Sequence, residues 1–294
     1  MSGLSGIKAE ILPLDWLGFS LLVMPEADLR WTRGALRADV TVADIGLDFG
    51  LGAIKYTYTP WTAAVSRSGG GAVGPTGPTV EKLDRVAFMG DLAWGIGDLT
   101  VYAEGQIRVG VESGYWIPGM KAAEDFTPGG RNQVVFRGLG GLMWQIDLGL
   151  TRPITLVTEY LYNGDGLSRE EARNFRTSYL AWTDSAASKA SAAPPMLLPG
   201  SFYGIGGMRQ HYFGLALNNI ALDRYVLIDA STVIGLDSGL IMGHAGLGVE
   251  FLRGTWLNLA WETWGSFYGE ADQPSELLLM ANRNRITLSV STGF

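Results

Sequence analysis

The sequence predicts an all-β protein, a transmembrane antiparallel up-and-down β-barrel. Three observations predict it. Apolar and polar residues alternate in many separate runs, most runs are long enough to cross a bilayer as tilted strands, and the connections between them alternate between short and long. The 294 residues, 1–294, are interpreted as one transmembrane barrel domain.

The composition suits a membrane protein built from strands. The chain is 47% hydrophobic and only 17% charged, whereas about a quarter of the residues of a soluble domain are charged. It contains no apolar run of the 18 or more residues that a transmembrane helix needs. Cysteine is absent, which excludes disulfides, thiolate metal sites and cysteine nucleophiles. The net charge of −7 argues against nucleic acid as a partner.

Seven runs in the first half of the chain alternate as strands do. In the run 99–109, Leu99 and Val101 share one face, whereas Glu104 and Arg108 share the other. The predicted strands are 7–12, 16–24, 35–43, 46–58, 85–94, 99–109 and 134–146.

Six further runs bring the count of predicted strands to thirteen. In the last run, Ile286, Leu288 and Val290 oppose Arg285, and the alternation continues to Phe294. These strands are 154–162, 210–218, 225–234, 240–251, 256–264 and 285–293. Most runs exceed the usual soluble strand of about 5–6 residues and suit the 9–11 residues of a membrane-crossing strand.

The connections predict two different rims. The short ones are 13–16, 42–46, 95–98, 148–153, 219–224 and 252–254, and the long polar ones are 25–34, 59–84, 110–133, 163–209 and 265–284. Only GLDSG (235–239) departs from this order, because it is short where a long link is expected. Tight turns on one rim and long loops on the other are typical of an outer-membrane barrel, whereas Greek-key sandwiches mix loop lengths.

Two features predict that the apolar face meets lipid. It carries small residues such as Ala103, Gly105 and Gly138, which would leave a sandwich core underfilled. Aromatic residues gather near strand ends, as in the interfacial belts of membrane barrels. They are Trp16, Trp94, Trp144, Tyr160, Tyr162, Tyr225, Phe251, Trp264 and Phe294.

With these features the chain resembles a porin-type β-barrel of the Gram-negative outer membrane. Its last strand, RITLSVSTGF, resembles the C-terminal signal that the barrel-assembly machinery recognises, ending in Phe294. YLYNGDGLSREE (160–171) and RQHYFGLAL (209–217) also resemble parts of porin-like proteins with long outer loops. The resemblance implies a bacterial outer-membrane location, lipid and the assembly machinery as partners, and short turns on the periplasmic side. It names no transported solute.

The odd strand count raises the expectation of further strands. Single-chain bacterial barrels normally have an even number, so the chain is expected to be the C-terminal part of a larger barrel, or the count is wrong by one. No signal peptide is recognised in MSGLSGIKAE. Either it has been removed, or the chain is a piece of a longer protein, which would agree with a partial barrel.

The charged residues on the polar face are the candidate pore-lining residues, because charges on a pore wall tune which ions pass. Alternatively, they only pair with one another across neighbouring strands. Both signs occur in similar numbers, so we expect weak ion selectivity. The candidates are Arg37, Asp39, Asp48, Arg85, Asp91, Glu104, Arg108, Arg137, Glu159, Asp229, His244, Glu250, Glu262, Arg283 and Arg285.

Two long links carry features of their own. In 163–209, SREEARNFR (168–176) predicts a short helix, and this link either folds into the lumen as a constriction or remains a surface loop. The stretch SRSGGGAVGPTGP (66–78) is expected to be flexible.

No enzymatic, metal or cofactor site is expected. The only histidines are His211 and His244. An esterase on a barrel needs a Ser–His pair on the outer face, but His244 lies on the polar face and His211 begins a strand. The glycine pattern in GHAGLG (243–248) lies within a predicted strand without a following helix, unlike a nucleotide loop.

Three functions stay open. The first is passive diffusion of small hydrophilic solutes through a polar lumen. We favour it because thirteen strands, with further ones expected, exceed the roughly eight to ten that side chains fill and approach the roughly 16 that leave an aqueous channel. The others are export of a polysaccharide or another polymer, and a structural barrel that does not conduct. A homo-oligomer is also left open.

Overall fold

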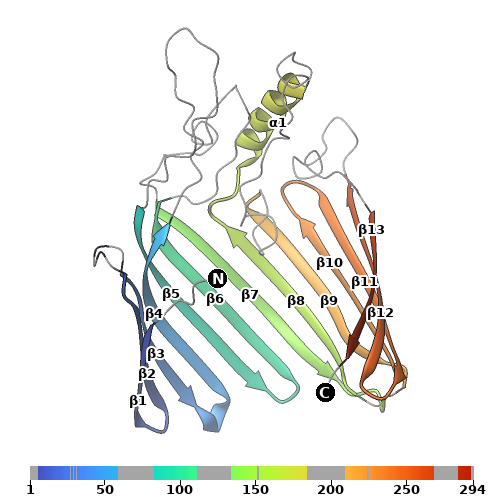
Figure 1. Cartoon of the computed structure of the whole chain (residues 1–294), viewed down its shortest axis with the longest axis horizontal. Coiled ribbons are helices and arrows are strands. Elements are labelled where there is room, and N and C mark those ends of the chain that lie inside the picture. Colours follow the sequence, from blue (N-terminus) through green and yellow to red (C-terminus); the bar gives the residue numbers. More distant parts are fainter. Residues whose placement is uncertain are drawn as a thin grey trace.

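A computed structural model of the protein describes residues 6–26, 28, 30, 32–58, 83–110, 134–150, 152–183, 209–223, 225–267 and 284–292. They form one antiparallel sheet of thirteen strands, in which every strand pairs with its neighbours in the chain. The prediction of an all-β, antiparallel, up-and-down fold is confirmed. Figure 1 shows tilted strands in a curved, barrel-like wall.

The strands are β1 (Ile7–Leu14), β2 (Leu17–Met24), β3 (Arg33–Val42), β4 (Leu47–Tyr58), β5 (Leu83–Ile96), β6 (Leu99–Val109), β7 (Val134–Ile146), β8 (Ile154–Asn163), β9 (His211–Ala221), β10 (Val226–Gly235), β11 (Leu240–Leu252), β12 (Thr255–Ser266) and β13 (Asn284–Thr292). All thirteen predicted strands are present, and their predicted ends are displaced by no more than a few residues. The helical segments are α1 (Arg169–Thr183) and the 3-10 turn η2 (Ala43–Ile45).

The two rims differ as predicted. Tight connections follow β1, β3, β5, β7, β9 and β11 on one rim, which we call the turn rim. The other rim, which we call the loop rim, carries the long links and α1 (Figure 1). Gly46 and Gly97 have φ values of 64° and 59° in the tight connections, a backbone conformation that residues with a Cβ rarely adopt.

The helix in the longest link begins with a capping box. Ser168 Oγ accepts a hydrogen bond from the Glu171 backbone N–H at 3.3 Å, and a Glu171 carboxylate oxygen accepts one from the Ser168 N–H at 2.8 Å. The helix predicted at 168–176 is therefore confirmed, although it continues to Thr183. It stands beyond the loop rim in Figure 1 rather than across the sheet. Among the described residues, no helix has the length and apolar character needed to span a membrane.

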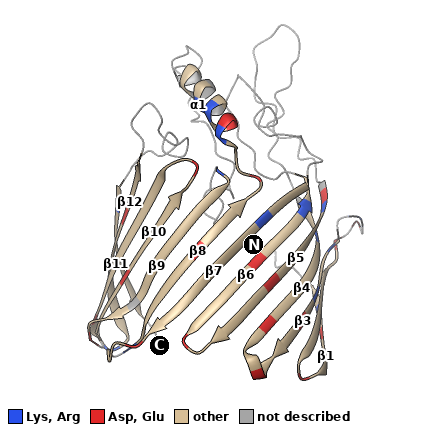
Figure 2. Cartoon of the chain, turned by 180° about the vertical axis from the view of Figure 1, so that it is seen from behind, with Lys and Arg blue, Asp and Glu red and all other residues tan. Residues whose placement is uncertain are grey.

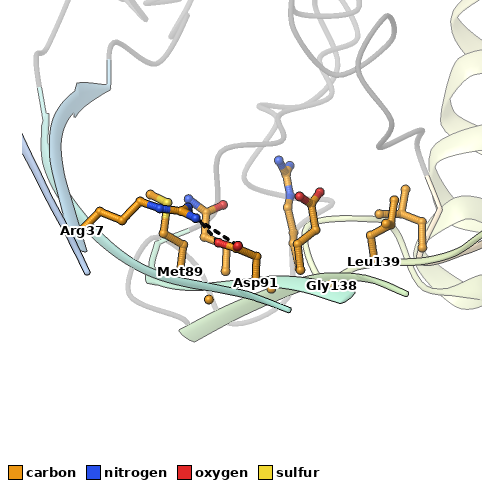
Figure 3. A pocket seen from close by; sticks show the side chains of 11 residues that line it. Arg37, Met89, Asp91, Gly138 and Leu139 are labelled. Carbon is orange, nitrogen blue, oxygen red and sulfur yellow. Dashed lines mark hydrogen bonds and ion pairs between the residues drawn. The ribbon is translucent and has the colours of Figure 1, made fainter. Parts of the chain in front are cut away.

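The sheet separates charged from apolar side chains. In Figure 3, Arg37, Met89, Asp91 and Leu139 rise from the concave face of the curved wall. The strand registers place all strand Asp, Glu, Lys and Arg residues on this face, except Lys55 and Asp84. These two lie on the convex face near the loop rim, with Lys55 Nζ 3.9 Å from Asp84 Oδ2.

The convex face exposes large apolar side chains along the whole sheet. Phe88 is 62% exposed, Leu51 53% and Leu288 67%. Aromatic residues near the strand ends are exposed as well, including Trp94 at 44% and Trp144 at 48%. No second layer of described residues covers these side chains, so the sheet has no sandwich core.

The wall is open along its two outer strands. Within the described residues, β1 pairs with β2 alone and β13 pairs with β12 alone. Because all pairs are antiparallel and the strand number is odd, β1 and β13 run in the same direction, from the loop rim to the turn rim. They therefore cannot join each other by antiparallel pairing.

Candidate functional site

A hollow of about 530 Å³ lies on the concave face over β3–β8 (Figure 3). Charged and amide side chains reach into it from different strands. Glycines, which have no side chain, leave space at its base. Its lining residues are Arg37, Met89, Gly90, Asp91, Glu104, Gly105, Gln106, Arg137, Gly138, Leu139 and Leu161. The hollow thus brings together four predicted pore-lining residues, namely Arg37, Asp91, Glu104 and Arg137.

Arg37 binds two carboxylates by reaching across a neighbouring strand. Its guanidinium donates to Asp39 at 2.5 Å and to both oxygens of Asp91, on β5, at 2.8 and 3.0 Å. Gly50 of the intervening β4 makes this reach feasible, because a Cβ there would lie 2.8 Å from the Asp91 Oδ1 atom and closer still to the guanidinium. The bidentate geometry fixes the position of Asp91 on the wall.

A second pair crosses β7 in the same way. The Tyr102 hydroxyl on β6 donates to Glu159 on β8 at 2.5 Å. Gly141 lies between them, paired with both in the sheet. A Cβ on Gly141 would meet the Tyr102 ring at 2.6 Å and the Thr158 carbonyl oxygen at 2.9 Å. Glycine on the concave face therefore leaves room for polar side chains to meet over a strand.

A ladder of ionisable groups runs across the last four strands of the sheet. His244 Nε2 lies 2.8 Å from Asp229 Oδ2, and His244 Nδ1 lies 4.0 Å from Glu262. Arg285 donates to Glu262 at 2.7 Å. Gly246 leaves room for the Asp229 carboxylate, which a Cβ would overlap. Four predicted residues are thus brought together here.

A buried cluster at the loop rim holds further predicted residues. The Asp165 carboxylate accepts a hydrogen bond from Arg108 and forms an ion pair with Arg137 at 2.5 Å. The side chains of Arg108 and Asp165 are 1% and 0% exposed. Asn163 Oδ1 accepts from Arg137 at 3.0 Å and from the Asp165 N–H at 3.3 Å. These contacts fasten the start of the longest link to β6 and β7.

Arg209 extends this cluster to the link between β10 and β11. Its guanidinium donates to the Asp237 carboxylate at 3.3 Å and to the Asp237 carbonyl at 3.0 Å. Its backbone N–H donates to the Tyr212 hydroxyl at 2.7 Å. The short GLDSG connection thus serves as the anchor for the far end of the longest link.

The predicted pore-lining residues divide into exposed and buried groups. Arg85 and Arg108 lie on the predicted face, but they are only 8% and 2% exposed, so the structure does not place them against open space. Arg108 is covered by the folded start of the longest link, where it pairs with Asp165. Arg85 donates a hydrogen bond to the Val109 carbonyl oxygen at 2.8 Å. Asp48 and Glu250 lie near the turn rim, where they accept from Thr41 and the Gly254 N–H. Arg283 and Phe294 lie outside the described residues.

Several residues that organise the face are not among the predicted ones. They are Gly50, Tyr102, Gly141, Asn163, Asp165, Arg209 and Asp237. A glycine on the polar face of a strand is a sequence signal that side chains of the two neighbouring strands can meet over it, as Arg37 and Asp91 do over Gly50. The loop-rim cluster has no such signal, because its members are far apart in sequence.

The two histidines lie on opposite faces of the sheet. His211 Nδ1 lies 2.6 Å from the Tyr160 hydroxyl on the convex face, beside the Tyr162 ring at 5.2 Å. His244 belongs to the ladder on the opposite face. No group of three or more His, Asp or Glu residues in the described part of the chain is arranged to hold a metal ion.

Comparison of the chain with models of known protein families and with curated proteins finds no match.

Proposed function

We propose that the protein forms the wall of a channel in the bacterial outer membrane, through which small hydrophilic solutes diffuse passively. The observation that carries this proposal is the division of the thirteen-stranded sheet into an apolar convex face and a polar concave face. A lumen lined by the concave face would be wet, and a convex face in lipid would need no other cover.

The convex face supports the membrane part of the proposal. Monomeric soluble proteins rarely expose large contiguous apolar patches, whereas this face exposes them over the whole sheet. A Lys or Arg in the middle of such a face in lipid costs about 2–4 kcal/mol. The two charges on the convex face lie near a strand end, where the cost falls to about 0–1 kcal/mol.

The concave face supports the channel part. Its charges and polar side chains would have to be desolvated in a packed interior, at a cost of several kcal/mol per unpaired ion. Asp39 and Asp91 are 44% and 38% exposed, so they remain open to water. A lumen of wide diameter keeps such groups hydrated and offers them to passing solutes.

Closure by antiparallel pairs alone needs one further strand between β1 and β13, because these two strands run in the same direction and could close the wall directly only by parallel pairing. A second copy in the same orientation cannot supply this pairing, because its β13 would run parallel to β1. The expectation of strands beyond the thirteen therefore remains part of the proposal. Recognition of the last strand by the assembly machinery also stays a prediction.

Conductance in planar lipid bilayers tests the function. The full-length protein, purified and refolded, is expected to give stepwise currents, and liposomes that contain it should swell in small sugars but not in large dextrans. Folded protein that inserts into lipid yet gives neither currents nor swelling would contradict the channel and favour a structural barrel. Selective passage of long polysaccharide chains would favour polymer export instead.

A further inference from the structure

The charges on the concave face are sorted by height along the wall. In the described strands, every Lys and Arg lies closer to the loop rim than to the turn rim. Five carboxylates of this face lie closer to the turn rim, namely Asp39, Asp48, Asp91, Asp229 and Glu250. In Figure 2, most of the acidic segments of β3–β7 lie below the basic ones.

The middle of the wall is acidic. Asp91 and Glu104 are direct cross-strand partners on β5 and β6, an arrangement that is unfavourable for like charges. Arg37 neutralises part of this charge through Asp91 and Asp39. Together with Glu159, these residues comprise four carboxylates and one guanidinium, a formal charge of −3.

Three arginines near the loop rim, Arg108, Arg137 and Arg209, do not balance this charge within the open space, and the exposed Arg285 is already paired with Glu262. Arg108 and Arg209 have side chains that are 1% and 6% exposed, and both are bound to Asp165 or Asp237. Arg137 is 33% exposed and donates to Asp165 as well. Glu104, by contrast, lines the hollow and has no ion-pair partner among the described residues.

We propose that the passage prefers cations, and that the acidic belt of Asp39, Asp91, Glu104 and Glu159 produces this preference. The inference rests on the proposed channel function and departs from the weak selectivity expected from the number of charges alone. Buried, paired arginines contribute little to the field in the lumen, whereas water-exposed carboxylates attract mobile cations. The solute class that the belt favours is small cations, inorganic or organic.

The reversal potential across a bilayer with a KCl gradient measures this preference. We expect a cation-to-anion permeability ratio on the order of 10 at low salt, because such charge arrangements create potentials of several kT. The ratio should fall towards 1 at high salt, since the screening length shrinks from about 30 Å at 0.01 M to about 3 Å at 1 M.

The variant E104Q/E159Q tests which groups are responsible. A glutamine side chain is nearly isosteric with the glutamate that it replaces, so the channel should still conduct while its permeability ratio falls several-fold. E170Q on the exposed start of α1 is the matched control, and its ratio should equal that of the parent protein.

The outcomes separate the two proposals. Three results would contradict the proposed role of the acidic belt but not the channel function. They are a permeability ratio near 1 at low salt, a preference for anions, and an unchanged ratio in E104Q/E159Q. A complete absence of currents in the parent protein would instead overturn the channel itself. Circular dichroism and heat-modifiable migration of each variant verify that it is folded.

Discussion

At the scale of single residues, burial decides which charges hold the wall together and which face the solute. Asp165 is fully buried between Arg108 and Arg137, whereas Glu262 is 28% exposed beside an Arg285 that is 63% exposed. Breaking a buried pair leaves an uncompensated charge, but an exposed pair contributes little because water screens it.

Asp165→Asn should therefore lower the free energy of unfolding by about 3–5 kcal/mol, because it removes the buried carboxylate that pairs with the buried Arg108 guanidinium. Glu262→Gln is the comparison and should change the free energy by less than about 1 kcal/mol. Urea unfolding in lipid vesicles, followed by tryptophan fluorescence, measures both. Equal losses in the two variants would contradict the structural role of the loop-rim cluster.

The bridged pairs give a second prediction at this scale. Gly141 and Gly214 flank Glu159 on its two sides in the sheet. Gly141→Ala should destabilise the fold by about 1–3 kcal/mol, because the added methyl group overlaps the Tyr102 ring and the Thr158 carbonyl. Gly214→Ala should have a much smaller effect, since its Cβ would meet Glu159 at an ordinary 3.8 Å. The same unfolding measurement applies, and a larger loss in Gly214→Ala would refute the bridging role of Gly141.

At the scale of elements, α1 depends on its first turn. Ser168→Ala removes the capping oxygen and should destabilise the start of the helix by about 0.5–2 kcal/mol. Amide hydrogen exchange should accelerate at Glu171 and Ala172 while the strands keep their protection. Thr177→Ala, an exposed position within the helix, is the control and should leave this exchange unchanged. An identical rate in both variants would show that the capping box is dispensable.

The elements also show what a sequence can predict and what it cannot. Strands were predictable because alternation is a local signal, so β6 and β7 begin and end where the pattern does. A helix in the longest link was predictable from the segment SREEARNFR (168–176), although its continuation to Thr183 was not. The loop-rim cluster was not, because the Arg108–Asp165 pair joins residues 57 positions apart and only the assembled sheet brings them together.

The burial of individual charged side chains could not be predicted from the sequence for the same reason. The alternation of polar and apolar residues correctly places Arg85, Arg108 and Glu104 on the polar face. It does not show which of these side chains are buried in the folded protein. The charge balance of the lumen therefore differs from the balance of residues counted along the strands.

At the scale of the whole molecule, the proposed channel requires that the convex face of the sheet meets lipid and that the concave face meets water. Leu92 and Ala93 are neighbours on β5 and point to opposite faces. Leu92→Arg should destabilise the membrane-inserted protein by about 2–4 kcal/mol, because it places a charge in the apolar band. Ala93→Arg should be tolerated, since its neighbour in the sheet is Asp48 on the wet face. Folding yield into vesicles measures the difference, and a reversed order would contradict the assignment of the faces.

The most direct measurement is a scan of single-cysteine variants along residues 86–93 of β5, which a chain without native cysteine permits. Each spin-labelled variant is inserted into lipid vesicles, and its accessibility to oxygen and to a water-soluble nickel complex is compared. We predict that oxygen access peaks at Val86, Phe88 and Leu92 and that nickel access peaks at Met89 and Ala93. Equal access to the nickel complex at all positions, or no access to oxygen at the first set, would contradict a wall with lipid on one side and water on the other.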